Sequence, residues 1–338
     1  MLFNKTGESS DAIRELVKHI SFIGKSFTFD RFESDLNHQE SELKKLVGNA
    51  IYTIAHDHYQ SSNYELDGDD TYAVQDELVH RMQSIIAILG YLDFAPSNDL
   101  THDTDGRHVR VNTETKSAYD WQLDRHEDSL RNKAYRYIDG LIEFLDLNSD
   151  SGQSLAAWRT STAYKKANEL LVNSAEKVDR FFPIESSRRI FLLIASFIRE
   201  MERKHIKPIL GNDRYAELKA AIISADGLEE EDELFVEEVV APPLVQLSMA
   251  QAFRRLPIRF WPEGIVQRYS SESKVANASS VATMEQCINV AQELEKIGKE
   301  GLKELADKMT VLDPPEEGDI DMSSIVKPAT GNEPFSLT

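Results

Sequence analysis

An internal repeat constrains this chain more than any other feature of its sequence. Residues 43–52 read LKKLVGNAIY and residues 206–215 read IKPILGNDRY, so both contain a Gly-Asn pair after a basic and apolar stretch. Residues 105–118 (DGRHVRVNTETKSA) and 263–276 (EGIVQRYSSESKVA) form a second pair of similar blocks. Because both pairs occur in the same order and are followed by similar apolar patterns, the sequence predicts a duplicated unit.

The matching glycines measure the offset between the two copies. It is 163 residues from Gly48 to Gly211 and 158 residues from Gly106 to Gly264, which indicates a shortened loop in the second copy. Glycine adopts positive φ without steric cost. We therefore expect Gly48 and Gly211 at helix ends, and Gly106 and Gly264 at hairpin tips. The residues assigned to such structural turns are Gly48, Asn49, Gly106, Gly211, Asn212 and Gly264.

Helical periodicity surrounds both copies. Apolar residues recur at helical spacing within 74–92, 119–146, 190–201 and 275–309. The expected fold is therefore mainly α, with two tandem helical-bundle units that each project a β-hairpin or loop between their last two helices.

Four regions are expected along the chain. They are a first unit at 1–146, a linker with connecting helices at 147–184, a second unit at 185–310 and a disordered acidic tail at 311–338.

Composition excludes several classes of protein. The chain has 38 Lys and Arg against 58 Asp and Glu, a net charge of −20. This sign disfavours a protein that grips nucleic acid, since such proteins place Lys and Arg against the phosphates. The single cysteine, Cys287, excludes an intramolecular disulfide, and its apolar neighbours favour a buried structural thiol. No apolar run of about 18 residues predicts a transmembrane helix, and the first 20 residues do not read as a signal sequence.

The second copy carries a longer pattern. An apolar helix leads into IKPILGNDRYAEL (206–218), followed by PLVQLSMAQAF (243–253) and PIRFWPEGIVQRYSSESKVA (257–276). This pattern resembles the head–tail connector (adaptor, or head-completion) proteins of tailed bacteriophages. The resemblance covers about residues 185–309 directly and 30–146 through the repeat. Such connectors usually have one unit and are shorter, and the first copy lacks a counterpart of Pro208.

The resemblance implies a structural role without catalysis. Connectors form a ring beneath the portal, with the DNA passage at its centre. The implied partners are the portal protein, tail or neck proteins and further copies of the chain, while DNA passes nearby without specific binding and no membrane is involved. The implied location is the head–tail junction of the virion, and the host cytoplasm during assembly.

The second hairpin offers candidate interface residues. Aromatic residues there favour a contact with a partner protein, with packing on their own bundle as the alternative. Nearby arginines favour an acidic patch on a neighbouring subunit, such as residues 226–238, which hold eight acids and no base. This acidic run would otherwise line the DNA passage or form a solvated loop. The interface candidates are Arg254, Arg255, Arg259, Phe260, Trp261, Arg268 and Tyr269.

Metal-ligand residue types occur without metal-ligand spacing. The first group is His56-Asp57-His58, and the second comprises His102, Asp103, Asp105 and His108. Neither has an HExxH pattern or a cysteine partner, and residues 67–70 match a calcium loop only in composition. We therefore expect no catalytic residue, no cofactor and no metal.

Three other functions remain open at this point. The first is another tail or injection-machine adaptor, such as a tail terminator or baseplate component. The second is a metal-dependent hydrolase that uses the histidine and aspartate loop. The third is a regulatory helical protein with an acidic interaction tail.

Overall fold

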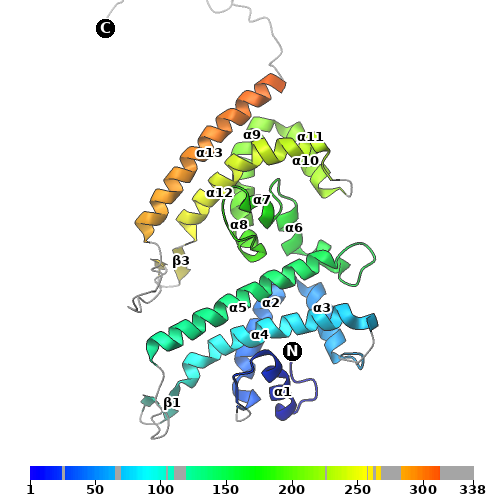
Figure 1. Ribbon diagram of the computed structural model, residues 1–338, viewed down its shortest axis with the longest axis vertical. Coiled ribbons are helices and arrows are strands. Elements are labelled where there is room, and N and C mark those ends of the chain that lie inside the picture. Colours follow the sequence, from blue (N-terminus) through cyan, green and yellow to red (C-terminus); the bar gives the residue numbers. More distant parts are fainter. Residues whose placement is uncertain are drawn as a thin grey trace, which may run out of the picture.

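A computed structural model describes residues 1–24, 27–64, 70–103, 106–109, 119–224, 227–256, 258–261, 264–267 and 283–312. Across these residues the chain is mainly helical, with two helical bundles and two short antiparallel hairpins (Figure 1). The predicted fold class is confirmed. No helix in the described ranges is both long and apolar enough to cross a membrane.

The first unit contains five α-helices and the first hairpin. Its elements are α1 (Ser9–His19), a 3-10 turn (Phe29–Arg31), α2 (Glu33–Val47), α3 (Asn49–Gln60), a second 3-10 turn (Asp70–Tyr72), α4 (Ala73–Asn98), β1 (Leu100–Asp103), β2 (Gly106–Val109) and α5 (Asp120–Leu147). The long helices α4 and α5 pack against each other, and α2 packs on α4.

The second unit repeats this plan after a helical connection. Its elements are a 3-10 turn (Ala156–Thr160), α6 (Thr162–Asn168), α7 (Ala175–Asp179), α8 (Arg188–Met201), a π-helical turn (Glu202–Ile206), α9 (Lys207–Leu210), α10 (Asn212–Ile223), α11 (Glu230–Phe235), a second π-helical turn (Val236–Val240), α12 (Ala241–Arg255), β3 (Ile258–Trp261), β4 (Gly264–Gln267) and α13 (Met284–Leu312). Helix α13 packs along α12, as α5 packs along α4.

The repeat is visible in the order of elements. In the first unit, α2 ends at Gly48, α3 follows, and α4 leads through a hairpin to α5. In the second unit, the continuous helix α8–α9 ends at Gly211, α10 follows, and α11–α12 leads through a hairpin to α13. Gly48 has φ 86° and ψ 157°, and Gly211 has φ 79° and ψ 166°. The predicted positive φ is thus present at both helix ends, with nearly the same backbone geometry.

Each hairpin has a two-residue connection. Asp103 pairs with Gly106 in the first hairpin, and Trp261 pairs with Gly264 in the second. The two glycines therefore begin the returning strands, while the connecting residues themselves, 104–105 and 262–263, lie outside the described residues.

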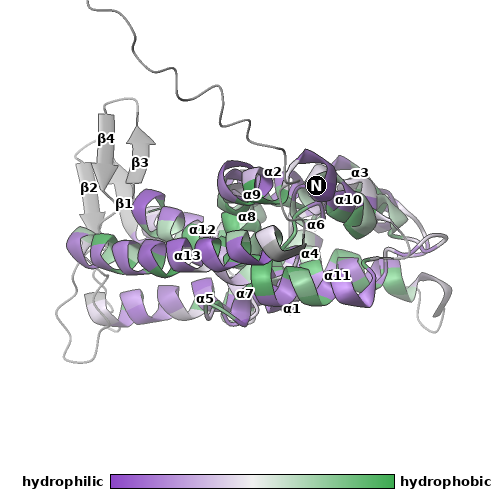
Figure 2. Ribbon diagram, turned by 90° about the horizontal axis from the view of Figure 1, so that it is seen from above, coloured by the Kyte–Doolittle hydropathy of each residue, from purple (hydrophilic) through white to green (hydrophobic). Residues whose placement is uncertain are grey.

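Each unit has its own hydrophobic core. The connecting region is divided between the two cores: Leu155 and Trp158 belong to the first, and Leu170 and Val178 to the second. Leu192 on α8 packs against both cores. Helix α13 covers the outer side of α12, while α5 lies between α4 and α8 of the second unit (Figure 1). Both helices carry many hydrophilic residues along their lengths (Figure 2). Helix α13 continues to Leu312, and the rest of the expected tail, 313–338, is outside the described residues.

Candidate assembly surface

The two hairpins mark one edge of the molecule. Each follows the end of its unit's central helix, α4 or α12, and both lie on the same side in Figure 1. This hairpin edge is the candidate functional surface. Three features position it: a buried glutamate in each unit, the junction between the units, and the helix ends from which the hairpins project.

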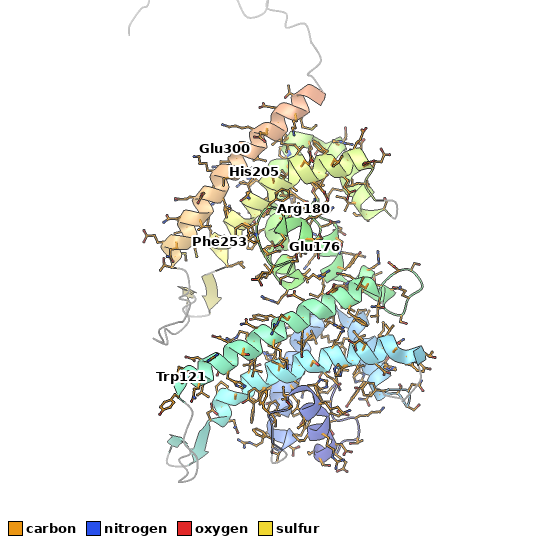
Figure 3. All side chains as sticks on the ribbon, viewed as in Figure 1. Trp121, Glu176, Arg180, His205, Phe253 and Glu300 are labelled. Atoms are coloured by element: carbon orange, nitrogen blue, oxygen red, sulfur yellow. The ribbon has the colours of Figure 1, made fainter. Side chains whose placement is uncertain are left out.

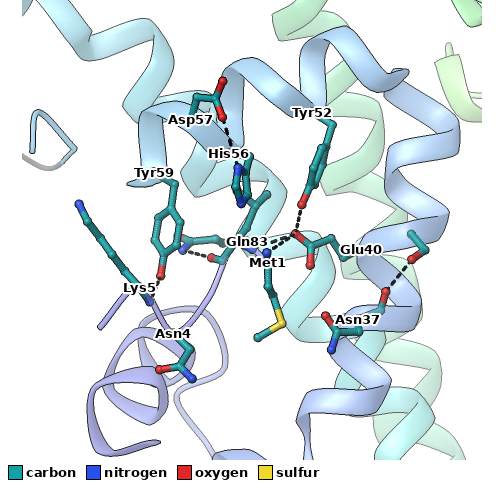
Figure 4. Close-up of polar contacts among 12 residues, drawn as sticks. Met1, Asn4, Lys5, Asn37, Glu40, Tyr52, His56, Asp57, Tyr59 and Gln83 are labelled. Atoms are coloured by element: carbon teal, nitrogen blue, oxygen red, sulfur yellow. Dashed lines mark hydrogen bonds and ion pairs between the residues drawn. The ribbon is translucent and has the colours of Figure 1, made fainter. Parts of the chain in front are cut away.

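A buried glutamate ties the first helices of the first unit together. Glu40 on α2 accepts hydrogen bonds from the Leu2 backbone N–H and the Tyr52 hydroxyl, both at 2.8 Å (Figure 4). Burial and the neighbouring carboxylate raise the pKa of Tyr52 above its usual value. The carboxylate thereby joins the chain start, α2 and α3 in one polar contact inside the core.

The second unit contains the same arrangement. Glu202, fully buried, accepts from the Leu171 backbone N–H, from the Tyr215 hydroxyl at 3.1 Å and from Lys219 Nζ at 2.9 Å. Tyr215 is the repeat partner of Tyr52, but a constant offset places Glu40 opposite Arg203. The π-helical turn at Glu202–Ile206 adds one residue before Gly211, and this extra residue hid the match from sequence analysis.

The junction between the units is built on the N-terminus of α8. Ser187 caps this helix by accepting from the Ile190 N–H. Asp139 on α5 accepts from Ser187 Oγ at 2.9 Å and from the Arg189 N–H at 2.7 Å. A carboxylate is favourable there, because the helix N-terminus carries unpaired N–H groups and partial positive charge. The Arg189 guanidinium also lies 3.8 Å from the centre of the Tyr135 ring.

Arg188 adds electrostatic contacts at the same junction. It lies within 4.0 Å of three carboxylates, Glu143, Asp146 and Glu176. Burial raises the pKa of Asp146, although a hydrogen bond from Trp158 opposes this shift. These contacts hold α5 of the first unit against α8 of the second.

The helix end before the second hairpin is held by ion pairs within the unit. Arg255 Nη1 and Nη2 donate to the two carboxylate oxygens of Glu200 at 2.6 and 3.0 Å. Arg254 pairs with Glu295 on α13. Hydrogen bonds from Lys299 and Arg254 lower the pKa of Glu295 to about 2. Both predicted interface arginines therefore stabilise their own bundle.

The remaining interface candidates lie on the hairpin itself. Arg259, Phe260 and Trp261 form most of β3. Arg268 and Tyr269 are outside the described residues. The interface prediction for these residues, and for Arg254 and Arg255, stays a prediction.

The helix start after the first hairpin has a different character. Among the side chains that the structure describes between Tyr119 and Ser129, none is buried. Leu130 is the first buried side chain of α5. Tyr119, Trp121 and Leu123 are 51, 43 and 38% exposed, and Figure 3 shows Trp121 at this end of α5. The helical spacing of this stretch predicts an ordinary amphipathic helix and gives no sign of its exposure.

An exposed ring lies beside the start of α5. The Phe22 side chain is 48% exposed, and its ring centre lies 5.2 Å from that of His126 and 4.9 Å from that of Tyr91. Both pairs are edge-to-face, the arrangement that aromatic rings favour. Phe22, from the loop after α1, therefore extends the exposed apolar surface of this helix start.

The acidic run at 226–238 is helical from Glu230 onward. Residues 230–238 form α11 and the first part of the following π-helical turn, 227–229 precede the helix, and 226 lies outside the described residues. Asp232 pairs with Arg214, and Glu237 pairs with Arg180 and Lys177. In Figure 1, α11 lies at the opposite end of its unit from the hairpin.

The histidine candidates divide into separate pairs. His58 is buried and lies 2.7 Å from Asp76, while His56 contacts the adjacent Asp57 at 3.4 Å. His102 and His108 lie on β1 and β2, where Asp103 is also found, and Asp105 is outside the described residues. Across the part of the chain that the structure describes, no group of three His, Cys, Asp or Glu side chains could hold a metal ion. Cys287 is buried on the α12-facing side of α13.

The fold and this surface define a class of protein: a duplicated helical bundle with one projecting hairpin in each copy. The chain belongs to a family described as a family of unknown function (DUF6712), whose model matches residues 39–168 and 206–307, more than half of the chain. Each matched segment contains one Gly-Asn turn and one hairpin, in agreement with the repeat. No curated protein and no solved structure is significantly similar to the chain.

Proposed function

We propose that the chain is a structural assembly protein of tailed bacteriophages, a head–tail connector that forms a ring between portal and tail around the DNA passage. The class of protein comes from the resemblance of residues 206–276 to connector proteins. The observation that carries the proposal is the duplicated bundle with both hairpins at one edge. Two projecting elements on one chain give two contact points for neighbouring subunits.

The charge of the chain supports this function. A conduit for DNA must let the phosphates pass without holding them, and a net charge of −20 repels a polyanion. The repulsion acts over a screening distance of about 8 Å at physiological ionic strength. The partners under this proposal are the portal, tail or neck proteins and other copies of the chain, at the head–tail junction and in the host cytoplasm during assembly.

The test is to combine the purified chain with the portal protein from the same genome and image the mixture by electron microscopy. We expect a symmetric ring of this chain on the portal. A chain that stays monomeric both alone and with the portal contradicts the proposal. A ring that binds the tail tube or baseplate but not the portal assigns the chain to another tail adaptor, such as a tail terminator.

A further inference from the structure

The first three turns of α5 present a surface that is largely exposed in the described structure. We call residues 119–129 the α5 overhang. Tyr119, Leu123, His126 and Leu130 fall at i, i+4, i+7 and i+11, one stripe of a helix. Only Leu130 of the four is buried. The apolar stripe that fixes α5 to its bundle therefore continues beyond the core, with Phe22 beside it.

The overhang is also strongly acidic. It contains four acids, Asp120, Asp124, Glu127 and Asp128, against one arginine, Arg125. Arg131 in the next turn pairs with Asp128 at 2.8 Å and with Glu127 at 4.0 Å. Residues 119–131 keep a net charge of −2, so a partner for this surface should combine apolar side chains with positive charge.

The second hairpin has this composition. Strands β3 (IRFW) and β4 (GIVQ) contain one charged residue, Arg259, and five large apolar residues. Their register pairs Phe260 with Ile265 and Arg259 with Val266. The first hairpin differs, since its strands LTHD and GRHV are mostly polar. The sequence of the second hairpin therefore complements the overhang in both hydrophobicity and charge.

We infer that the β3–β4 hairpin of one copy docks on the α5 overhang of a second copy. A second copy can reach the overhang because Trp121 and Leu123 are exposed in the described structure. Two different surfaces then meet, so the contact is head-to-tail, and repetition of it produces a ring or an open filament. This inference rests on the proposed function, since it names the subunit contact of the proposed ring.

Two variants that each lose one surface test the contact. Trp261→Asp removes a large aromatic side chain from the hairpin, and Leu123→Asp removes the apolar centre of the overhang. We expect each to self-associate at least about tenfold more weakly than the unaltered chain in sedimentation experiments. Mixed together, they should form a dimer of one copy of each, because one retains the overhang and the other the hairpin.

A matched control lies on the same helix. Leu147, at the other end of α5, is 70% exposed, and Leu147→Asp should leave self-association unchanged. Circular dichroism identifies any variant that has lost its helical fold. Arg259→Glu, which reverses the charge on the hairpin, should weaken association by a smaller factor, and high salt should reduce the difference.

The outcomes separate this inference from the proposed function. If the unaltered chain assembles and the two variants assemble equally well, the docking site is wrong and the proposed function stands. If each variant is monomeric and the mixture of the two is also monomeric, the inference is wrong. The hairpin then binds within its own chain or to another protein. If the unaltered chain is monomeric at every concentration and with the portal, both are wrong.

Discussion

The helices that follow the two hairpins begin differently. In the second unit, α13 starts at Met284 and already buries Cys287 and Ala291 in its first turns. In the first unit, none of the described side chains in the first three turns of α5 is buried, and Trp121 is exposed. The duplication has therefore kept the fold of the unit and changed its surfaces. Two copies that differ in this way can make one directional contact, whereas two identical surfaces would compete.

The scaffold beneath these surfaces is nearly the same in both units. Gly48 and Gly211 share one backbone geometry, and Glu40 and Glu202 each accept a tyrosine hydroxyl. The differences are additions to the second unit: two π-helical turns, and Lys219 beside the buried carboxylate. Substitutions at matched positions show whether corresponding residues contribute equally to the stability of the two units.

The largest difference is expected at the buried glutamates. Glu202→Ala leaves the Leu171 N–H without its acceptor and removes the charge partner of Lys219, whose side chain is only 19% exposed. Breaking a buried ion pair by removing one partner costs about 3–5 kcal/mol. We expect a loss of this size in the free energy of unfolding, measured by urea denaturation.

Glu40→Ala is the matched control. Glu40 accepts from a backbone N–H and a hydroxyl, and the Met1 ammonium lies 4.0 Å from its Oε1, a longer charge contact than the 2.9 Å between Lys219 and Glu202. Loss of an acceptor for buried neutral donors costs about 1–3 kcal/mol. Equal losses at Glu40 and Glu202 would contradict the role assigned to Lys219.

Acidification is expected to affect the first unit more than the second. His19 on α1 is buried, and its Nδ1 lies 2.9 Å from Ser84 Oγ. Burial lowers the pKa of His19 from 6.5 to about 4, and the neighbouring His80 and Lys18 act in the same direction, against a hydrogen bond with Gln83. The unfolded chain therefore binds a proton more readily than the folded chain between these two values.

The sign follows from linkage. The contribution of His19 is fully present above pH 6.5 and is lost as the pH falls toward 4, with a total of about 3 kcal/mol at 1.36 kcal/mol per pKa unit. Hydrogen exchange between these pH values should show amides of the first core losing protection before those of the second. His19→Leu should flatten this dependence, and an unchanged profile would contradict the assignment to His19.

Sequence periodicity could predict the helices and both glycine turns, because apolar spacing and φ > 0 are local properties. It could not match Glu40 with Glu202, because a π-helical turn shifts the register by one residue without changing the apolar pattern. Nor could it find the overhang, since Leu123 has the same spacing in the stripe as the buried Leu130. Burial depends on where the neighbouring helices end, and α5 extends beyond them.

A smaller effect is expected at the close approach of α13 to α12. A Cβ at Gly298 would lie 2.6 Å from Leu247 Cγ and 3.4 Å from the Leu247 backbone N. Gly298→Ala therefore forces the two helices apart, with a cost of about 2–3 kcal/mol, the upper part of the range for overpacking. Thermal unfolding measures this cost.

The matched position in the first unit should behave differently. A Cβ at Gly140 on α5 would meet only the end of the Arg81 side chain, at 3.2 Å. Arg81 is held there by a hydrogen bond to the Gly140 carbonyl and an ion pair with Glu77, so its guanidinium must shift slightly. Because alanine favours helix over glycine by about 1 kcal/mol, which offsets this shift, Gly140→Ala should be close to neutral. Equal costs at Gly298 and Gly140 would mean that α5 packs as closely on its neighbour as α13 does on α12, which would contradict the expected difference.

The smallest effect tests the duplication itself. Gly48 and Gly211 hold φ and ψ in a region that side chains with a Cβ rarely adopt. Space is not the obstacle, because a Cβ at Gly48 would come no closer than 3.5 Å to Ser161, and a Cβ at Gly211 would have no described neighbour within 4 Å. Each glycine-to-alanine change should therefore cost only backbone strain, about 1 kcal/mol or slightly more. The two losses should be equal and should add within about 0.5 kcal/mol, since the sites lie in separate units. Unequal losses in urea denaturation would mean that one of the two turns has become dispensable since the copies diverged.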